Sequence, residues 1–162
     1  MSNIEEYYQW ICNNPNKVCK KIKTIYKKLV DEIHTEKELS FVKDGKQETH
    51  KYHFDIKKAQ RPIEFIETFC KQSKGKWNGK QIKLQLFQKA MIEAAFGFVD
   101  EKGLRKYKKV IFFVARKNGK SVLDSALALF CMIADKEGGA EIYSVARMVA
   151  TINRVKSVEV KI

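Results

Sequence analysis

The sequence predicts a mixed α/β fold in which a mainly helical N-terminal region, residues 1–100, precedes an incomplete parallel βαβ core, residues 101–162. Before the core, apolar residues recur at helical spacing in several segments. The uninterrupted apolar run at 110–115 is typical of a parallel strand that is buried on both faces. An alanine- and leucine-rich segment and a second apolar run, at 140–146, follow it, and this order predicts a right-handed strand–helix–strand unit.

Size and composition are those of one folded domain with a sizeable core. The chain has 162 residues, of which 44% are hydrophobic and 11% aromatic, so the composition excludes a disordered chain. No apolar run approaches the ~20 residues that a membrane helix needs, and residues 1–14 lack the apolar segment of a signal peptide. We therefore expect a soluble, intracellular protein.

The cysteines and histidines indicate neither disulfides nor a metal centre. The four cysteines show no C-x-x-C spacing and lie among apolar or helical neighbours. His50 and His53 have the spacing of half a metal site but no matching ligand nearby, so a strand surface is the favoured interpretation. Reduced, buried thiols are predicted at Cys12, Cys19, Cys70 and Cys131.

The net charge of +13 favours a polyanionic partner, nucleic acid first and an anionic membrane second. The alternative is a basic domain from a lysine-rich proteome that binds no polyanion. Much of the charge lies on one face of a helix predicted at 17–35. That face carries Lys17, Lys20, Lys21, Lys23, Lys27 and Lys28. A solvated polar face is the simpler interpretation, and contact with DNA or with a protein partner is the alternative.

The N-terminal region begins with two predicted helices and a hairpin. Residues 4–12 are expected to form a helix with an aromatic side, and a breaker around Pro15 separates it from the helix at 17–35. Residues 39–42 and 51–54 flank a polar segment that contains the turn sequence Asp-Gly. This arrangement predicts a β-hairpin near residues 39–54.

Two amphipathic helices are expected after the hairpin. Asp55 suits a helix cap, and Pro62 requires the following helix to begin near it or to bend there. The apolar face of this helix continues to about residue 72. A loop at 75–80 precedes a second helix at 85–96, and a turn bounded by glycines then leads toward the core.

A short cationic loop follows the apolar run at 110–115 and has the composition of a phosphate-binding loop. It reads R-K-N-G-K-S, and a predicted helix at 121–134 comes directly after it. A glycine in this position lets backbone N–H groups and the helix N-terminus approach an anion closely. Lys120 would reach the outer phosphates, and the Ser121 hydroxyl would help to hold a magnesium ion. The sequence therefore predicts a nucleotide site on a partial P-loop NTPase core.

The G-K-S motif is short, so its surroundings decide between a site and an ordinary turn. The usual G-x-x-x-x-G-K-[ST] pattern fails here, because Val114 occupies the position of its first glycine. A lysine in a strand-to-helix turn, with Ser121 as helix cap, therefore stays open as an alternative. The flanking strand and helix favour the site. So does the crowding of Arg116 and Lys117 beside Lys120, because a bound anion stabilises clustered cations.

The segment A-R-K-N-G-K-S, followed by A-E-I-Y-S-V-A at 140–146, resembles the ATPase half of the large terminase subunit of tailed bacteriophages. That family uses a variant phosphate-binding loop without the first glycine. The resemblance covers about residues 52–146. Its upstream segments are R-P-I-E-F-I-E at 61–67, K-G-K-W-N-G-K at 74–80, L-Q-L-F-Q-K at 84–89 and F-G-F at 96–98.

The resemblance implies an ATP-driven motor that packages viral DNA into a preformed shell in the cytoplasm of the bacterial host. A separate nuclease domain of the family cuts concatemeric DNA. The implied partners are double-stranded DNA, the small terminase subunit and the portal protein, and the full-length motor could form a homo-oligomeric ring. The implied cofactors are ATP and Mg²⁺.

By motif position, the resemblance also assigns roles to individual residues. Arg116 would sense or stabilise the γ-phosphate, and Gln88 would recognise adenine, although a plain surface role for Gln88 stays open. Phe87 departs from the family, which often has tryptophan there. The nucleotide would be bound by Lys117, Asn118, Gly119, Lys120, Ser121 and Gln88.

The carboxylates that ATP hydrolysis requires are not recognisable in this sequence. Hydrolysis needs one carboxylate to hold magnesium and a glutamate to polarise the attacking water. No acid after Ser121 follows an apolar strand, and the acidic cluster of a two-metal nuclease is missing. The acids in question are Asp124, Asp135, Glu137, Glu141 and Glu159. We therefore expect an N-terminal fragment that at most binds nucleotide.

Two other interpretations stay open. The chain could be a basic, non-enzymatic DNA-binding module in which G-K-S is incidental. It could also be a fragment of another P-loop ATPase, such as a helicase. Residues 147–162 are predicted as one more helix and differ from the terminase pattern. The possibility of another P-loop ATPase therefore stays open.

Overall fold

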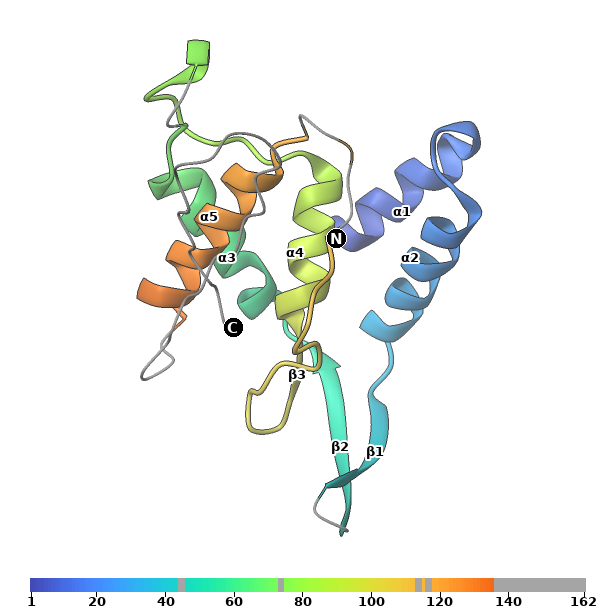
Figure 1. The fold of residues 1–162 in the computed structure, drawn as a ribbon. Coiled ribbons are helices and arrows are strands. Elements are labelled where there is room, and N and C mark those ends of the chain that lie inside the picture. Colours follow the sequence, from blue (N-terminus) through green and yellow to red (C-terminus); the bar gives the residue numbers. More distant parts are fainter. Residues whose placement is uncertain (44–45, 73–74, 113–114, 116–117, 136–162) are drawn as a thin grey trace, which may run out of the picture.

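The computed structural model describes residues 1–43, 46–72, 75–112, 115 and 118–135. Helices surround a central helix, α4 (Leu86–Gly97), and a small sheet adjoins them. Figure 1 shows α1 (Asn3–Asn13) and α2 (Lys20–Ile33) on one side of α4. On the other side lie α3 (Ile56–Phe69) and α5 (Lys120–Ile133). The mixed α/β character is as predicted.

Helix α4 is central because its sequence is apolar on nearly every side, which is typical of a buried helix. One hydrophobic core joins it to α3 and α5 and includes Ile92 and Phe130. A second core joins it to α1 and α2 and includes Ile11 and Ala90. The helix therefore holds the two sides of the protein together.

Glu93, on α4, is a fully buried carboxylate that fixes the start of α1. It accepts a hydrogen bond from the backbone N–H of Ile4 at 3.0 Å and another from the Asn3 side-chain amide at 2.5 Å. The first N–H groups of a helix have no partner within the helix, and the helix dipole favours a negative charge there. Glu93 therefore adds to the cap that Ser2 provides for α1.

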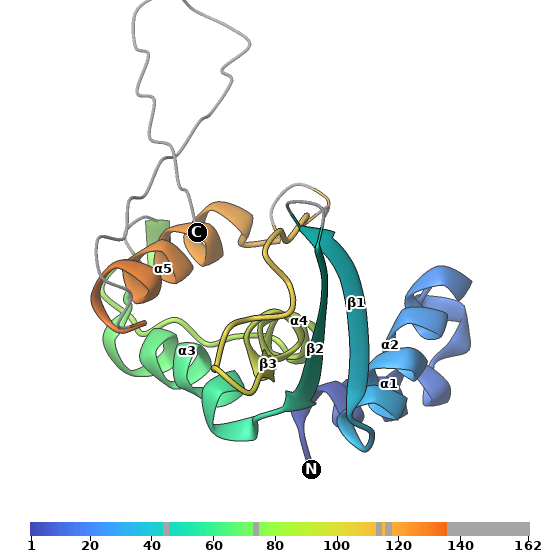
Figure 2. The same ribbon diagram turned by 90° about the horizontal axis from the view of Figure 1, so that it is seen from below.

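The predicted hairpin is confirmed and is longer than expected. Strands β1 (Lys37–Lys43) and β2 (Lys46–Phe54) are antiparallel, and β3 (Phe98–Asp100) pairs with the end of β2. Figure 2 shows β1 and β2 side by side, with α1 and α2 on one side and α3 and α5 on the other. The predicted turn sequence at 44–45 lies outside the described residues.

The predicted helices at 4–12, 85–96 and 121–134 are confirmed as α1, α4 and α5. The helix predicted at 17–35 begins later, at Lys20. Its start is delayed because Pro15 opens a single 3₁₀ turn, η1 (Pro15–Lys17), after which Val18 is extended with φ −133° and ψ 137°.

Asp55 caps α3 as predicted, and its carboxylate accepts hydrogen bonds from the backbone N–H groups of Lys57 and Lys58. The helix begins at Ile56 and continues through Pro62, so of the two alternatives that the proline left, a start near it is wrong. Pro62 is buried against the core, and its missing N–H removes only one helical hydrogen bond. Packing therefore outweighs the local preference of proline to end or delay a helix.

The predicted parallel strand at 110–115 is wrong for the residues that the structure describes, 110–112 and 115. None of these is in a strand, and Ile111 is 92% exposed instead of buried on both faces. A strand requires a hydrogen-bonded neighbour, and the neighbour predicted for this one, 140–146, lies outside the described residues, as does the helix predicted at 147–162. The sheet in the described part is antiparallel, so the parallel βαβ unit stays a prediction.

The prediction of four buried thiols is half correct. Cys70 and Cys131 are buried in the core of α3, α4 and α5, whereas Cys12 and Cys19 are exposed. Cys12 lies at the end of α1 and Cys19 directly before α2, at the turn between the two helices. None of the four forms a disulfide.

Candidate functional site

The loop that precedes α5 makes the turn that an anion-binding loop requires. Gly119 has the left-handed conformation, with φ 71° and ψ 11°, and Lys120 is the first residue of the helix. A residue with a Cβ is strained at such a positive φ, so the glycine is needed for the backbone to turn here. The first N–H groups of α5 have no partners within the helix and carry the positive end of its dipole.

The side chain of Gln88 joins the start of α4 to this loop. Its Nε2 donates a hydrogen bond to the backbone carbonyl oxygen of Asn118 at 3.3 Å, and its Oε1 accepts one from the backbone N–H of Gln85 at 2.9 Å. Gln88 is only 7% exposed. The surface role that the sequence left open for this glutamine is therefore wrong, and Gln88 lies beside the loop that contains the other predicted site residues.

A cavity of about 260 Å³ lies between the two segments. One wall is formed by residues just before α4 and in its first turn, including Phe87 and Gln88. The other wall is formed by the start of α5. Apolar and polar side chains line the cavity in about equal measure, and the amide of Gln88 is one of the polar groups.

Gln88 can still make the pair of hydrogen bonds that recognise adenine. An amide oxygen accepts two hydrogen bonds and an amide nitrogen donates two, and the described contacts use one of each. Glutamine pairs with adenine through one donor and one acceptor. The chemistry of this side chain, and its place beside the loop, therefore fit a nucleotide base.

Glu67, on α3, positions this part of the site and was not predicted from the sequence. One carboxylate oxygen accepts a hydrogen bond from the backbone N–H of Leu84 at 3.0 Å, and the other pairs with the Lys89 ammonium at 2.9 Å. The two contacts hold the segments on both sides of Gln88. No sequence pattern indicates them, because they join residues far apart along the chain.

Lys120 and Ser121 are exposed at the first turn of α5. Asp124, one turn later, is a neighbour of Lys120, and desolvation raises the pKa of its carboxyl against a smaller lowering effect of the lysine ammonium. A magnesium ion bound to nucleotide phosphates would find a hydroxyl ligand in Ser121. In the described part of the chain, no three acids, histidines or cysteines gather as they would for a metal ion bound by the protein alone.

The remaining predicted site residues divide into two groups. Asn118 lies at the loop, where its side-chain amide donates a hydrogen bond to the carbonyl oxygen of Ala115 at 3.1 Å. Arg116 and Lys117 lie outside the described residues. The loop and Gln88 are thus brought together, as the site requires, and the positions of these two cations stay a prediction.

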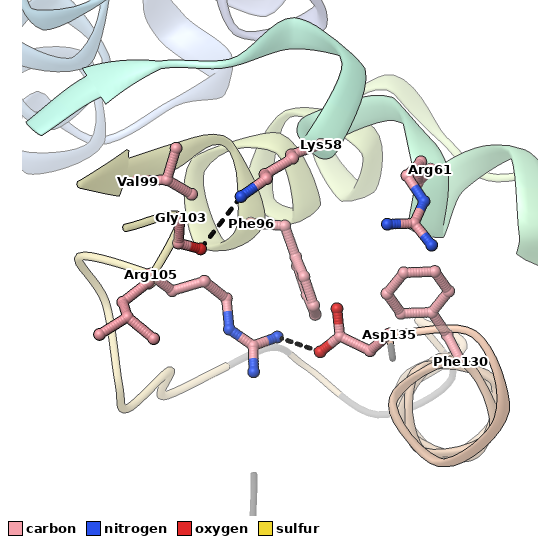
Figure 3. Close-up of a pocket in the computed structure, with 9 residues that line it drawn as sticks. Lys58, Arg61, Phe96, Val99, Gly103, Arg105, Phe130 and Asp135 are labelled. Atoms are coloured by element: carbon pink, nitrogen blue, oxygen red, sulfur yellow. Dashed lines mark hydrogen bonds and ion pairs between the residues drawn. The ribbon is translucent and has the colours of Figure 1, made fainter. Parts of the chain in front are cut away.

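A second cavity, of about 380 Å³, lies near the other end of α5 (Figure 3). Arg61 donates a hydrogen bond to the carbonyl oxygen of Ala134 at 2.6 Å, and Arg105 pairs with Asp135 at 2.9 Å. Carbonyl groups at a helix C-terminus need such donors. These contacts anchor the end of α5. Asp135 pairs with Arg105 there, about 20 Å along the helix axis from Lys120.

His50 and His53 lie on β2, as predicted for a strand surface. The Nδ1 of His50 lies 3.1 Å from the carboxylate of Asp100, on the neighbouring strand. Among the helices that the structure describes, none has the length and apolar character needed to cross a bilayer.

Comparison with known families gives a match over part of the chain. Residues 86–154 match the family model "Terminase large subunit, ATPase domain". This range begins at α4, contains Gln88, and includes the loop and all of α5. No curated protein and no solved structure matches the chain significantly. The resemblance seen in the sequence is therefore confirmed over residues 86–154, which match the ATPase domain of the terminase large subunit, and its upstream part, from about residue 52 to 85, lies outside the match.

Proposed function

We propose that this chain is the ATP-binding portion of a phage terminase large subunit, the motor that packages viral DNA into procapsids. The observation that carries the proposal is the contact between Gln88 and Asn118. It brings the residue expected to recognise the base to the loop expected to bind the phosphates. The family match covers both, which supports the same assignment.

In this proposal the loop and the start of α5 bind the triphosphate. Gly119 allows the tight turn, and the N–H groups of the first helical turn face the anion. Lys120 adds a positive charge for the outer phosphates, and Ser121 binds magnesium through its hydroxyl. Arg116 and Lys117 would add charge on the other side of the loop, with Arg116 at the γ-phosphate.

The base would enter the cavity between the two segments. Gln88 would pair with the adenine edge, and the apolar wall around Phe87 would cover the ring. The Asn118 carbonyl holds the glutamine amide in place for this task, which reduces the entropy lost on binding. The proposal therefore predicts a preference for ATP over GTP.

For the intact motor, the proposed partners are double-stranded DNA, the small terminase subunit and the portal protein. Hydrolysis of ATP and cleavage of concatemeric DNA are proposed for the complete large subunit, whose acidic residues for these reactions were not recognised in this sequence. For the present chain we propose nucleotide binding. A basic DNA-binding module without a nucleotide site is the competing function, supported by the exposed lysines of α2.

Magnesium-dependent binding of ATP tests the proposal. We expect saturable binding of ATP that is weakened by EDTA, and we expect Ser121→Ala to lose most of the magnesium effect. Ser125→Ala is the matched control, because Ser125 is an exposed serine one turn along α5 whose hydroxyl bonds only to the Ser121 carbonyl among the described contacts. Absence of saturable ATP binding, or an equal loss in both variants, would contradict the proposal.

A further inference from the structure

The exposed face of α2 concentrates positive charge over its first nine residues, and Asp31, four residues after Lys27, is the first acid to follow on the same side of the helix. No Asp or Glu occurs between Glu6 and Asp31. Within this stretch we define the lysine face as Lys17, Lys20, Lys21, Lys23, Lys27 and Lys28, all of which are exposed. Lys17 lies in η1, and the other five lie on α2.

The five lysines of α2 share one side of the helix. At about 100° per residue, they fall within an arc of about 160°. The opposite side carries Ile22, Tyr26 and Leu29, which pack against α1 and α4. The lysine face is thus directed away from the core by the same pattern that buries the apolar side.

The lysine face differs from three other lysines of the described chain, whose charges are paired with acids. Elsewhere, Lys51, Lys89 and Lys106 form ion pairs with Glu38, Glu67 and Glu32. Within the described residues, no lysine of this face forms an ion pair. The Lys17 ammonium lies 6.0 Å from the Trp10 ring centroid. Lys20, Lys23 and Lys27 are neighbours along one side of the helix, so their charges repel one another.

We infer that the lysine face of α2 is the surface through which this chain binds the phosphate backbone of duplex DNA. The inference rests on the proposed function, which makes double-stranded DNA the partner. A bound polyanion would remove the repulsion along α2. The lysines from 20 to 28 extend over about 12 Å of helix. Duplex DNA presents one negative charge per ~1.7 Å of its axis, so a single duplex offers phosphates to the whole face.

The location of the face leaves it accessible while nucleotide is bound. Figures 1 and 2 both show α2 on one side of α4 and the body of α5 on the other. The cavity beside Gln88 and Gly119 includes no residue of α1 or α2 in its lining. DNA and ATP would therefore bind at separate surfaces, and substitutions in one should leave the other intact.

The test is the salt dependence of binding to a short fluorescent DNA duplex of mixed sequence, followed by anisotropy. The test variant replaces Lys20, Lys23 and Lys27 with Gln, which removes three charges and keeps a good helix former at each position. The matched control replaces Lys57, Lys71 and Lys102 with Gln, because these are also exposed but lie in three different segments of the chain. A third variant replaces the three α2 lysines with Arg, which keeps the charge.

We expect the slope of log K against log salt to fall in magnitude by about 0.9 for each lost phosphate contact, so by about 2.7 in the α2 variant. The control and the arginine variant should keep nearly the wild-type slope. An equal decrease in the control, or an unchanged slope in the α2 variant, would overturn the inference. So would binding to vesicles that contain phosphatidylserine but not to DNA.

ATP binding, measured on the same proteins, separates this inference from the proposed function. If the α2 variant loses DNA binding and keeps ATP binding, both stand. If the wild-type chain binds ATP but shows no salt-dependent DNA binding, the inference fails and the nucleotide site stands. If DNA binds through α2 but ATP does not bind, the DNA surface stands, and the chain is a basic DNA-binding module.

Discussion

The side-chain amide of Gln88 donates a hydrogen bond to the backbone carbonyl oxygen of Asn118, 3.3 Å away. This contact joins the first turn of α4 to the loop before α5. Because Gln88 also accepts a hydrogen bond from the Gln85 backbone N–H, its amide is fixed at both ends. A base bound by Gln88 would therefore lie at a defined position relative to phosphates bound by the loop.

Replacing Gln88 with Ala should reduce the preference for ATP over GTP. Loss of a paired donor and acceptor should weaken ATP binding by about tenfold, close to 1.4 kcal/mol, with a smaller effect on GTP. Competition of the two nucleotides against a fluorescent ATP analogue measures this. Gln81→Ala is the control, because Gln81 is an exposed glutamine just before α4 that does not line the cavity. An unchanged ATP preference in Gln88→Ala would rule out base recognition by this residue.

Replacing Gly119 with Ala should strain the backbone and weaken nucleotide binding. A Cβ at this position would lie 3.5 Å from the Gln88 Nε2, which is ordinary contact, so the cost arises from the positive φ and is about 1–2 kcal/mol. Thermal unfolding and ATP titration measure the two effects. Gly79→Ala is the matched control, since Gly79 has φ 78° and nothing within 4 Å of an added Cβ.

Both glycine variants should therefore lose similar stability, whereas only Gly119→Ala should lose ATP affinity. Equal ATP affinities in the two variants would show that the turn at Gly119 is needed for the fold alone. The comparison separates a role in binding from a role in folding, because the backbone strain is nearly the same in both.

Asp100 should make stability depend on pH in the acid range. The Asp100 side chain is 4% exposed, and desolvation by itself raises the pKa of its carboxyl. Hydrogen bonds from the backbone N–H of Leu104 and from His50 lower this pKa by more, so the net pKa is below the ordinary value. A lowered folded-state pKa stabilises the fold above the unfolded pKa, near ~3.9, and this contribution is lost as pH falls through the folded pKa.

Asp100→Asn should therefore be less stable than wild type at neutral pH, by about 1–3 kcal/mol for the weakened buried hydrogen bonds. The difference in the free energy of unfolding should narrow below about pH 4. Urea unfolding at several pH values measures it. A difference that stays constant from neutral pH to pH 3 would show that ionisation of Asp100 contributes nothing.

Most helices were predictable from local patterns, because apolar spacing and caps are local properties. The cap at Asp55 and the glycine turn at Gly119 are examples in which one residue type fits one backbone geometry. The contacts of Glu93 with Ile4, and of Glu67 with Leu84, could not be predicted in this way. They join residues brought together only by the packing of α1, α3 and α4.

The candidate site was predictable in its composition but only partly in its geometry. The sequence placed Gln88 and the loop on separate segments, and only the structure shows that they meet. The run at 110–115 was assigned to a buried strand from its composition, yet Ile111 is exposed. Strand formation depends on a pairing partner, which the composition of one segment does not supply. The division at residue 100 into two domains stays a prediction.

Binding of ATP to the Lys120→Ala variant tests the central claim, that the loop before α5 holds a triphosphate. Isothermal titration in the presence of Mg²⁺ measures it, with Lys102→Ala as a control of equal charge at an exposed position. Loss of a charged contact to phosphate predicts weaker binding by about 3 kcal/mol, roughly 150-fold, in Lys120→Ala alone. Equal affinity of wild type and Lys120→Ala for ATP would contradict the account.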